Sequence, residues 1–148
     1  MKTLKVLVVL FLFLLVTSST FAQDKEDVLA VVNNALEAFN QHNLATFFSY
    51  FTTDVSVFTY VVSPLRHDAA DFKSFIEGTT SLAYVNLHQQ EYQVQIYNAD
   101  AAVVTGYFTF TWMEKGGQMN YQTGRVTTVE VKQDGKWLIA HMHFSKMF

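Results

Sequence analysis

The residues of this sequence that are best suited to bind a charged group lie near its C-terminal end. His141 and His143 are two positions apart in a segment that alternates like a β-strand, so both imidazoles are expected on one face. A three-residue loop with a bulge at Asp134-Gly135 would place Arg125 and Thr127 of the preceding strand opposite them. A two-residue turn would put Arg125 on the other face. In the first register, the patch can hold a carboxylate or phosphate through charge-assisted hydrogen bonds.

The same polar patch also has a structural interpretation. Trp137 and Ile139 are expected on the same face as the two histidines. In the structural interpretation, the imidazoles are neutral and are hydrogen-bonded within a polar network, or they line a dimer interface. Two histidines are too few ligands for a zinc site, and no third ligand can be named from the sequence. The chain has no cysteine, which removes thiolate metal sites and disulfides. We therefore expect no metal and no cofactor.

Acid–base chemistry would need a carboxyl group in apolar surroundings, where desolvation raises its pKa toward neutrality. Glu114 is the candidate, because three aromatic residues share its strand face and it can stand at the rim of an apolar cavity. These are Phe108, Phe110 and Trp112. The alternative for Glu114 is a solvated residue beside a hairpin. Glu130 is also in mid-strand, but it lies between two valines and is expected on the opposite face.

Aromatic side chains are abundant, and most of them are expected in the core. Among the aromatic residues, Tyr50, Tyr60 and Tyr107 are the best candidates to line a cavity, because each brings a hydroxyl group that can orient a ligand. The residues expected to contact a ligand are therefore Arg125, His141, His143, Tyr50, Tyr60, Tyr107, Trp112 and Glu114. No catalytic residue can be assigned.

The elements that must position these residues follow from hydrophobic spacing. Apolar residues recur at intervals of three and four from residue 24 onward, which predicts a helix. It should end near His42-Asn43, because asparagine tolerates the left-handed conformation common at helix ends. The next elements are predicted as a short helix over Leu44 to Phe51, a strand over Val55 to Val62 after a connection, and a helix over Asp68 to Ser81.

Three turn signals rich in Asn, Asp and Gly divide the remainder into long antiparallel strands. The predicted strands are His88 to Tyr97, Ala101 to Glu114, Met119 to Lys132 and Trp137 to Phe144. Helices come first and a meander follows. The fold class is therefore α+β, with helices packed on one face of a strongly curved antiparallel sheet.

Four segments carry a resemblance to a known superfamily. They are AFNQHNLATFFSYFTTDVSVF (38–58), NADAAVVTG (98–106), GRVTTVEVKQDGKW (124–137) and WLIAHMHFS (137–145), of which the last is the most specific. They resemble the nuclear transport factor 2-like superfamily, and within it the SnoaL-like proteins and the association domain of calcium/calmodulin-dependent kinase II. The resemblance implies a cone-shaped, cystatin-like fold, a cavity in the mouth of the cone and a dimer across the outer sheet face. The superfamily hosts isomerases, dehydratases, cyclases and oligomerisation modules, so the fold implies no reaction.

The N-terminal segment has the three parts of a cleaved export signal. Lys2 and Lys5 precede an apolar run, and small residues before Gln23 fit a cleavage site. The run is shorter than the roughly 18 to 20 residues that span a bilayer, which argues against a retained membrane anchor. Lipidation is excluded because there is no cysteine. We expect a signal peptide over residues 1–22 and one SnoaL-like domain over residues 23–148, periplasmic or secreted.

Charge and composition narrow the possible partners. Removal of residues 1–22 leaves eight basic and thirteen acidic residues, a formal charge of −5, which disfavours nucleic-acid binding. The expected function is the binding of a small, largely apolar molecule, with or without an acidic group, in the cavity of a homodimer. One alternative is an isomerase, dehydratase or cyclase that uses a cavity histidine or glutamate with a tyrosine. A further alternative is an oligomerisation module.

Overall fold

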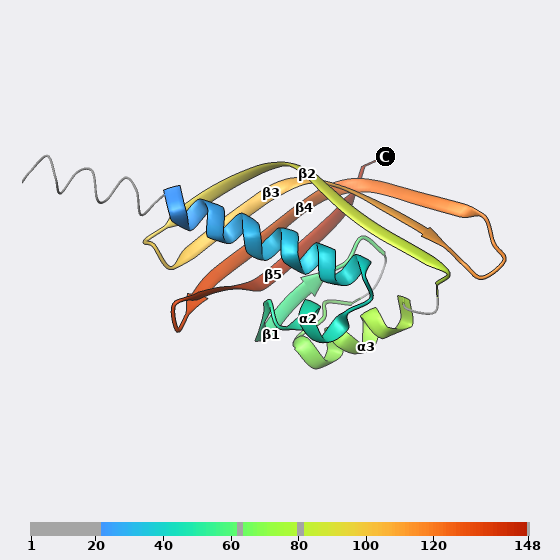
Figure 1. Ribbon diagram of the computed structural model, residues 1–148, viewed down its shortest axis with the longest axis horizontal. Helices are drawn as coiled ribbons and strands as arrows, with labels where there is room; N and C mark the ends of the chain where they lie inside the picture. Colours follow the sequence, from blue (N-terminus) through green and yellow to red (C-terminus); the bar gives the residue numbers. More distant parts are fainter. Residues whose placement is uncertain (1–21, 62–63, 80–81, 148) are drawn as a thin grey trace, which may run out of the picture.

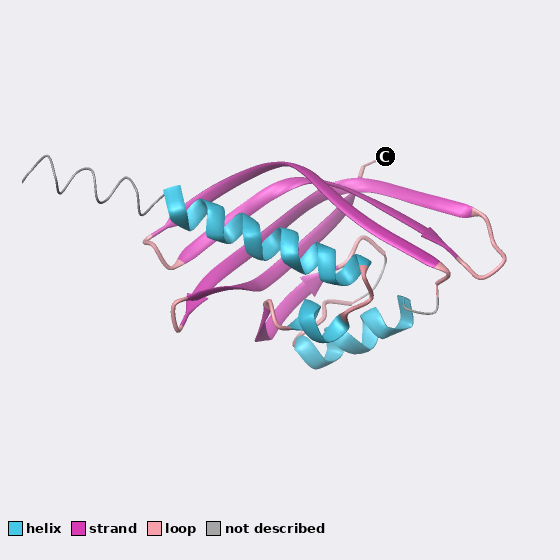
Figure 2. Ribbon diagram, viewed as in Figure 1, coloured by secondary structure: helices cyan, strands magenta, loops and turns pink. Residues whose placement is uncertain are grey.

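The computed structural model describes residues 22–61, 64–79 and 82–147 of the chain. Helices lie on one face of a five-stranded sheet that arches over them (Figures 1 and 2). The predicted signal peptide falls outside the described residues except for its last residue. No helix in the described part of the chain is long and apolar enough to cross a membrane.

The first helix, described over residues 22–40, lies along the inner face of the sheet (Figure 1). It ends where His42 adopts a left-handed backbone conformation, with φ of 56°. We predicted Asn43 for this role. Asn43 instead caps the next helix, α2 (Leu44–Phe48), because its side chain accepts a hydrogen bond from the Thr46 backbone N–H at 3.2 Å.

Strand β1 (Phe51–Phe58) begins four residues earlier than predicted, and α2 is correspondingly shorter. The segment Thr52 to Asp54, predicted as a connection, is part of the strand. Pairing with the last strand explains the difference, since the Ile139 N–H donates to the Tyr50 carbonyl oxygen at 2.8 Å and Phe51 lies opposite Ile139. Tertiary packing overrides the local helical pattern at this point.

Helix α3 (Ala69–Thr79) starts as predicted, because the Asp68 carboxylate accepts a hydrogen bond from the Asp71 N–H at 2.8 Å. Strand β2 (Tyr84–Tyr97) begins four residues before the predicted start at His88. Its additional residues pair with the far end of the third strand. This part of the sheet therefore continues beyond the helices (Figure 1).

The remaining strands are β3 (Ala101–Met113), β4 (Met119–Gln133) and β5 (Lys136–Lys146). The strand order is β1-β5-β4-β3-β2, and neighbouring strands are antiparallel except β1 and β5, which are parallel. The predicted α+β class with helices on one face of a curved sheet is confirmed. One pair departs from the antiparallel arrangement, because β1 joins the edge of the sheet beside β5 and runs parallel to it.

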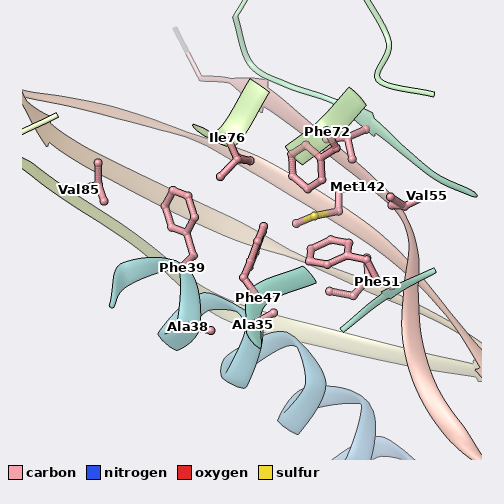
Figure 3. Close-up of a cluster of buried hydrophobic side chains, with 12 residues drawn as sticks. Ala35, Ala38, Phe39, Phe47, Phe51, Val55, Phe72, Ile76, Val85 and Met142 are labelled. Atoms are coloured by element: carbon pink, nitrogen blue, oxygen red, sulfur yellow. The ribbon is translucent and has the colours of Figure 1, made fainter. Parts of the chain in front are cut away.

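Aromatic side chains fill the space between the helices and the inner face of the sheet (Figure 3). The Phe47 ring centroid lies 5.6 Å from that of Phe39, 4.7 Å from that of Phe51 and 6.0 Å from that of Phe72. These tilted and edge contacts are the arrangements that aromatic rings favour. A second apolar cluster lies under the start of the first helix and contains Val28, Val32, Ala102, Val104 and Trp137.

Candidate functional site

A bulge at Ala140 decides which face of β5 carries the histidines. The register between β4 and β5 shifts there, so that Ala140 is left without a partner residue on β4. Trp137 and Ile139 are buried on the inner face, whereas His141 and His143 lie on the outer face. The prediction that all four side chains share one face is therefore wrong, because the extra residue reverses the alternation.

The same bulge brings Arg125 and Thr127 to the face of the histidines. The Asp134-Gly135 turn has two residues, both with positive φ, 50° and 77°. Such a turn alone would have placed Arg125 on the face away from the histidines. Because of the bulge, Thr127 lies opposite His143 and Arg125 lies opposite Ser145, all on the outer face.

This outer-face patch is held by contacts that do not involve the helices. The Ser56 hydroxyl and His141 Nδ1 form a hydrogen bond of 2.8 Å. Burial and the neighbouring charge of His143 lower the pKa of His141. Arg125 is exposed and lies opposite Tyr107, which is 37% exposed. Within the described ranges, no three His, Asp or Glu side chains lie close enough together to hold a metal ion.

An apolar cavity of about 100 Å³ lies between the helices and the inner face of the sheet. A cavity that holds one water molecule measures roughly 10–15 Å³, so this space can admit a small organic group. The first helix, α3, the end of β1 and the inner face of the sheet all contribute side chains to its walls. The lining is aliphatic and aromatic apart from Thr59, Tyr60, Gln89 and Thr128.

Tyr60 is the predicted ligand-contacting residue that lines this cavity. Its ring centroid lies 5.7 Å from that of Phe108, and burial raises the pKa of its hydroxyl group. The other predicted residues lie elsewhere. Tyr50 and Trp112 are half-buried beside the core, Glu114 is exposed beyond the end of β3, and Tyr107, Arg125, His141 and His143 lie on the outer face.

Sequence reasoning misplaced a buried carboxyl group, that of Glu130. Its side chain is fully buried, 0% exposed, on the inner face of β4 rather than on the face predicted for it. The Thr128 hydroxyl donates a hydrogen bond to Glu130 Oε1 at 2.5 Å, and Oε2 has no partner among the described residues. Burial raises the pKa of Glu130 to about 7, against the opposing effect of the hydrogen bond from Thr128.

Two polar side chains connect the cavity wall to its surroundings. Thr128 lines the cavity while it is bonded to the buried carboxyl group of Glu130. Gln89 is 5% exposed, and its Nε2 atom has no hydrogen-bond partner in the described part of the chain. Gln89 also lines a neighbouring polar groove of about 390 Å³ between the first helix and β2. Asn40 bridges the sides of this groove through hydrogen bonds of 2.7 and 3.0 Å to the backbone of Leu87.

Comparison with known proteins agrees with this architecture. The family model of the calcium/calmodulin dependent protein kinase II association domain matches residues 24–148. A solved structure of a candidate domain of this kind from Xanthomonas campestris is 26% identical, with a TM-score of 0.73 over 81% of this chain and 85% of that chain. No curated protein matches.

Two further solved structures show the fold. A nuclear transport factor 2-like superfamily protein from Salmonella enterica is 20% identical, with a TM-score of 0.77 over 86% of this chain and 94% of that chain. A candidate scytalone dehydratase from Novosphingobium aromaticivorans is 14% identical, with a TM-score of 0.81 over 88% of this chain and 89% of that chain. The predicted nuclear transport factor 2-like fold is confirmed. Since the family model covers nearly all of the described residues, this chain belongs to the calcium/calmodulin-dependent protein kinase II association domain family.

Proposed function

We propose that this domain binds a small, largely apolar molecule in the cavity between its helices and the inner face of its sheet. The supporting observation is an internal space of about 100 Å³ walled almost entirely by aliphatic and aromatic side chains. A benzene-sized group buries on the order of 150 Å². At about 25 cal/mol per Å², this burial contributes roughly 4 kcal/mol, which corresponds to an affinity near 1 mM for a simple aromatic probe.

A pair of alanines on the first helix gives a matched test. Ala35 is 3% exposed and lines the cavity, whereas Ala30 on the same helix is exposed. Ala35→Leu should fill part of the cavity and abolish the binding of toluene and ethylbenzene, measured by NMR titration of the ¹⁵N-labelled protein. Ala30→Leu makes the same chemical change on the opposite face of the helix and should leave binding unaltered.

Arg125→Ala provides a second control. Arg125 lies on the outer face, so its removal should not change the affinity for toluene. The proposal is wrong if the native protein shows no saturable shifts with either hydrocarbon, or if Ala35→Leu binds both as the native protein does. Circular dichroism of each variant separates loss of binding from loss of folding.

Glu130 supports a second candidate function, an isomerase, dehydratase or cyclase. A carboxyl group with a pKa near 7 is suited to general acid–base catalysis at neutral pH. Glu130 is not itself part of the cavity lining, so a proton would reach a substrate through the Thr128 hydroxyl that bonds to it. His141 and His143 lie on the opposite face of the sheet and do not line this cavity. Tyr60 is the tyrosine in the cavity lining.

Deuterium exchange tests this second candidate directly. If Glu130 accepts protons from a carbon acid in the cavity, the methyl hydrogens of acetophenone should exchange with D₂O faster in the presence of the protein. Glu130→Gln and Thr128→Val should each remove the acceleration. Exchange at the rate of buffer alone, or acceleration that survives both substitutions, would remove this candidate.

We also propose that the domain forms a homodimer through the outer face of its sheet. Phe58 and Tyr107 are exposed large side chains on this face, 43% and 37% exposed, and they flank the patch that contains His143 and Arg125. Membership of a family named for association supports assembly. Tyr107→Glu should shift the protein to monomer in sedimentation velocity at micromolar concentration. A native protein that is already monomeric there would refute the dimer.

The place of action proposed for this domain is outside the cytoplasm. The support is the sequence pattern of residues 1–22, which combines a basic start, an apolar run and small residues at the expected cleavage site. N-terminal sequencing of the protein recovered from its native cell should begin at Gln23. A chain that still begins at Met1 would contradict this proposal.

A further inference from the structure

Gln89 carries an unused hydrogen-bond donor at the wall of the apolar cavity. The side chain is 5% exposed, and its Nε2 atom finds no acceptor among the described residues. Buried amide groups are almost always hydrogen-bonded, because a donor removed from water and left unpaired destabilises the fold. A ligand oxygen placed against Nε2 would satisfy this donor.

The position of Gln89 also indicates where such an oxygen would lie. Gln89, Leu36 and Leu87 line both the apolar cavity and the neighbouring polar groove. Gln89 therefore lies at the boundary between the apolar cavity and the polar groove. A molecule with its hydrocarbon part in the cavity would present an oxygen to Gln89 at this boundary, and any further polar part would extend into the groove.

The charges around both spaces disfavour an anion. Neither lining contains a lysine or arginine, the groove contains the carboxylate of Glu37, and the buried carboxyl group of Glu130 bonds to the cavity wall through Thr128. A carboxylate placed here would lose its hydration and meet no lysine or arginine in either lining, and His88 is the one basic side chain of the groove lining.

Two cations lie near the cavity but outside its lining. The guanidinium carbon of Arg66 is 4.9 Å from the ring centroid of Phe75, and Arg66 is already paired with Asp71 at 3.1 Å. Lys146 is exposed, with Nζ 5.9 Å from the ring centroid of Tyr60. Both cations therefore lie against the rings of lining residues rather than in the lining itself.

We propose that Gln89 is a specificity-determining residue whose side-chain amide donates a hydrogen bond to the carbonyl or hydroxyl oxygen of a neutral, otherwise apolar ligand, and that carboxylates are excluded. This inference rests on the proposed binding function and adds the chemical class of the ligand. It assigns the polar selectivity to the inner face of β2 rather than to the outer-face patch of Arg125, His141 and His143.

Four probes of one skeleton test the inference: toluene, benzyl alcohol, acetophenone and benzoate, each titrated into ¹⁵N-labelled protein at pH 7.5. The alcohol and the ketone should bind about 5- to 10-fold more tightly than toluene, the gain expected from one satisfied buried donor. Benzoate should bind at least about tenfold more weakly than benzyl alcohol. Gln89→Leu removes the amide and leaves an apolar side chain that is one atom shorter, and it should make toluene, benzyl alcohol and acetophenone bind about equally.

The stability of the free variant separates specificity from a structural role. Because Gln89→Leu deletes an unpaired donor, its melting temperature should equal or exceed that of the native protein. A lower melting temperature with an unchanged ratio of probe affinities would mean that Gln89 only supports the fold, and would overturn the inference. Gln93→Leu, on the exposed face of the same strand, should alter neither quantity. If Gln89→Leu does not fold, Gln89→Met makes the same comparison.

The outcomes distinguish this inference from the function on which it rests. If toluene binds and the two oxygen-bearing neutral probes bind no better, the cavity is a binding site but Gln89 does not select its ligand. If benzoate binds most tightly, the assigned ligand class is wrong. If none of the four probes binds, the proposed function fails and the inference fails with it.

Discussion

Replacing Glu130 with glutamine should stabilise the protein at neutral and alkaline pH. The carboxyl group is fully buried, and none of the ion pairs among the described residues involves it. Burial raises its pKa from 4.5 to about 7. With about 1.4 kcal/mol for each pH unit of difference between the folded and unfolded pKa, ionisation costs about 3 kcal/mol of stability.

The sign of the pH dependence follows from the direction of this shift. The folded protein holds the Glu130 proton more tightly than the unfolded chain does, so folding is favoured by protonation. The stabilising contribution of Glu130 is complete below about pH 4.5, declines as the pH rises, and is lost above about pH 7. Glutamine has the shape of the protonated form and never ionises, so Glu130→Gln should lack this decline.

Urea denaturation of both proteins between pH 4.5 and 8.5, followed by tryptophan fluorescence, measures the effect. The difference in unfolding free energy between Glu130→Gln and the native protein should grow by about 3 kcal/mol across this range, mostly between pH 5 and 7. Glu114→Gln, at an exposed position, should show a difference that stays flat. If the difference for Glu130→Gln is equally independent of pH, the conclusion that the buried carboxyl group of Glu130 ionises near neutral pH is refuted.

Three other predictions follow from the packing and the hydrogen bonds. Gly124→Ala should lower the unfolding free energy by about 1–3 kcal/mol, because the added Cβ would lie 2.1 Å from the Ser145 backbone oxygen. Gly78→Ala in α3 should raise it by about 0.5–1 kcal/mol, because a Cβ there meets nothing within 4 Å. Urea denaturation of both variants measures the two effects. His143→Gln should raise the NMR titration midpoint of His141 by removing a repelling charge, and an unmoved midpoint would contradict the assigned cause. Asn40→Leu should lower the unfolding free energy in urea by about 1–3 kcal/mol, because it leaves the part-buried backbone N–H and carbonyl groups of Leu87 without their partner.

The elements with regular spacing could be predicted from the sequence, and the errors fall where distant pairing decides. Hydrophobic periodicity and turn residues predict the first helix and α3, and they also predict strands β3, β4 and β5. The start of β1 at Phe51 could not be predicted this way, because it depends on a parallel contact with Ile139, far away in the chain. The early start of β2 likewise depends on pairing with β3 rather than on its own composition.

The outer-face patch was harder to predict, because a single extra residue, Ala140, brings its side chains to one face. A regular register from a two-residue turn puts Arg125 and the histidines on opposite faces. No residue type around Ala140 predicts the bulge that brings them to the same face. Alternation could not place Glu130 either, because its strand carries Val126 on one face and Val129 and Val131 on the other. Only the structure shows that Val126 and Thr128 are buried on the same face as Glu130.

The bulge at Ala140 leaves different polar groups on the two faces of the sheet. On the outer face, Arg125 and two imidazoles surround an exposed surface, which suits an anionic group or a second protein surface. On the inner face, the polar groups are an acid with a pKa near 7, a threonine hydroxyl bonded to it and an amide donor. If both proposals hold, assembly through the outer face and ligand binding through the inner face use different side chains of the same strands. Substitution of Arg125 should then change assembly without changing ligand affinity, and substitution of Gln89 should do the reverse.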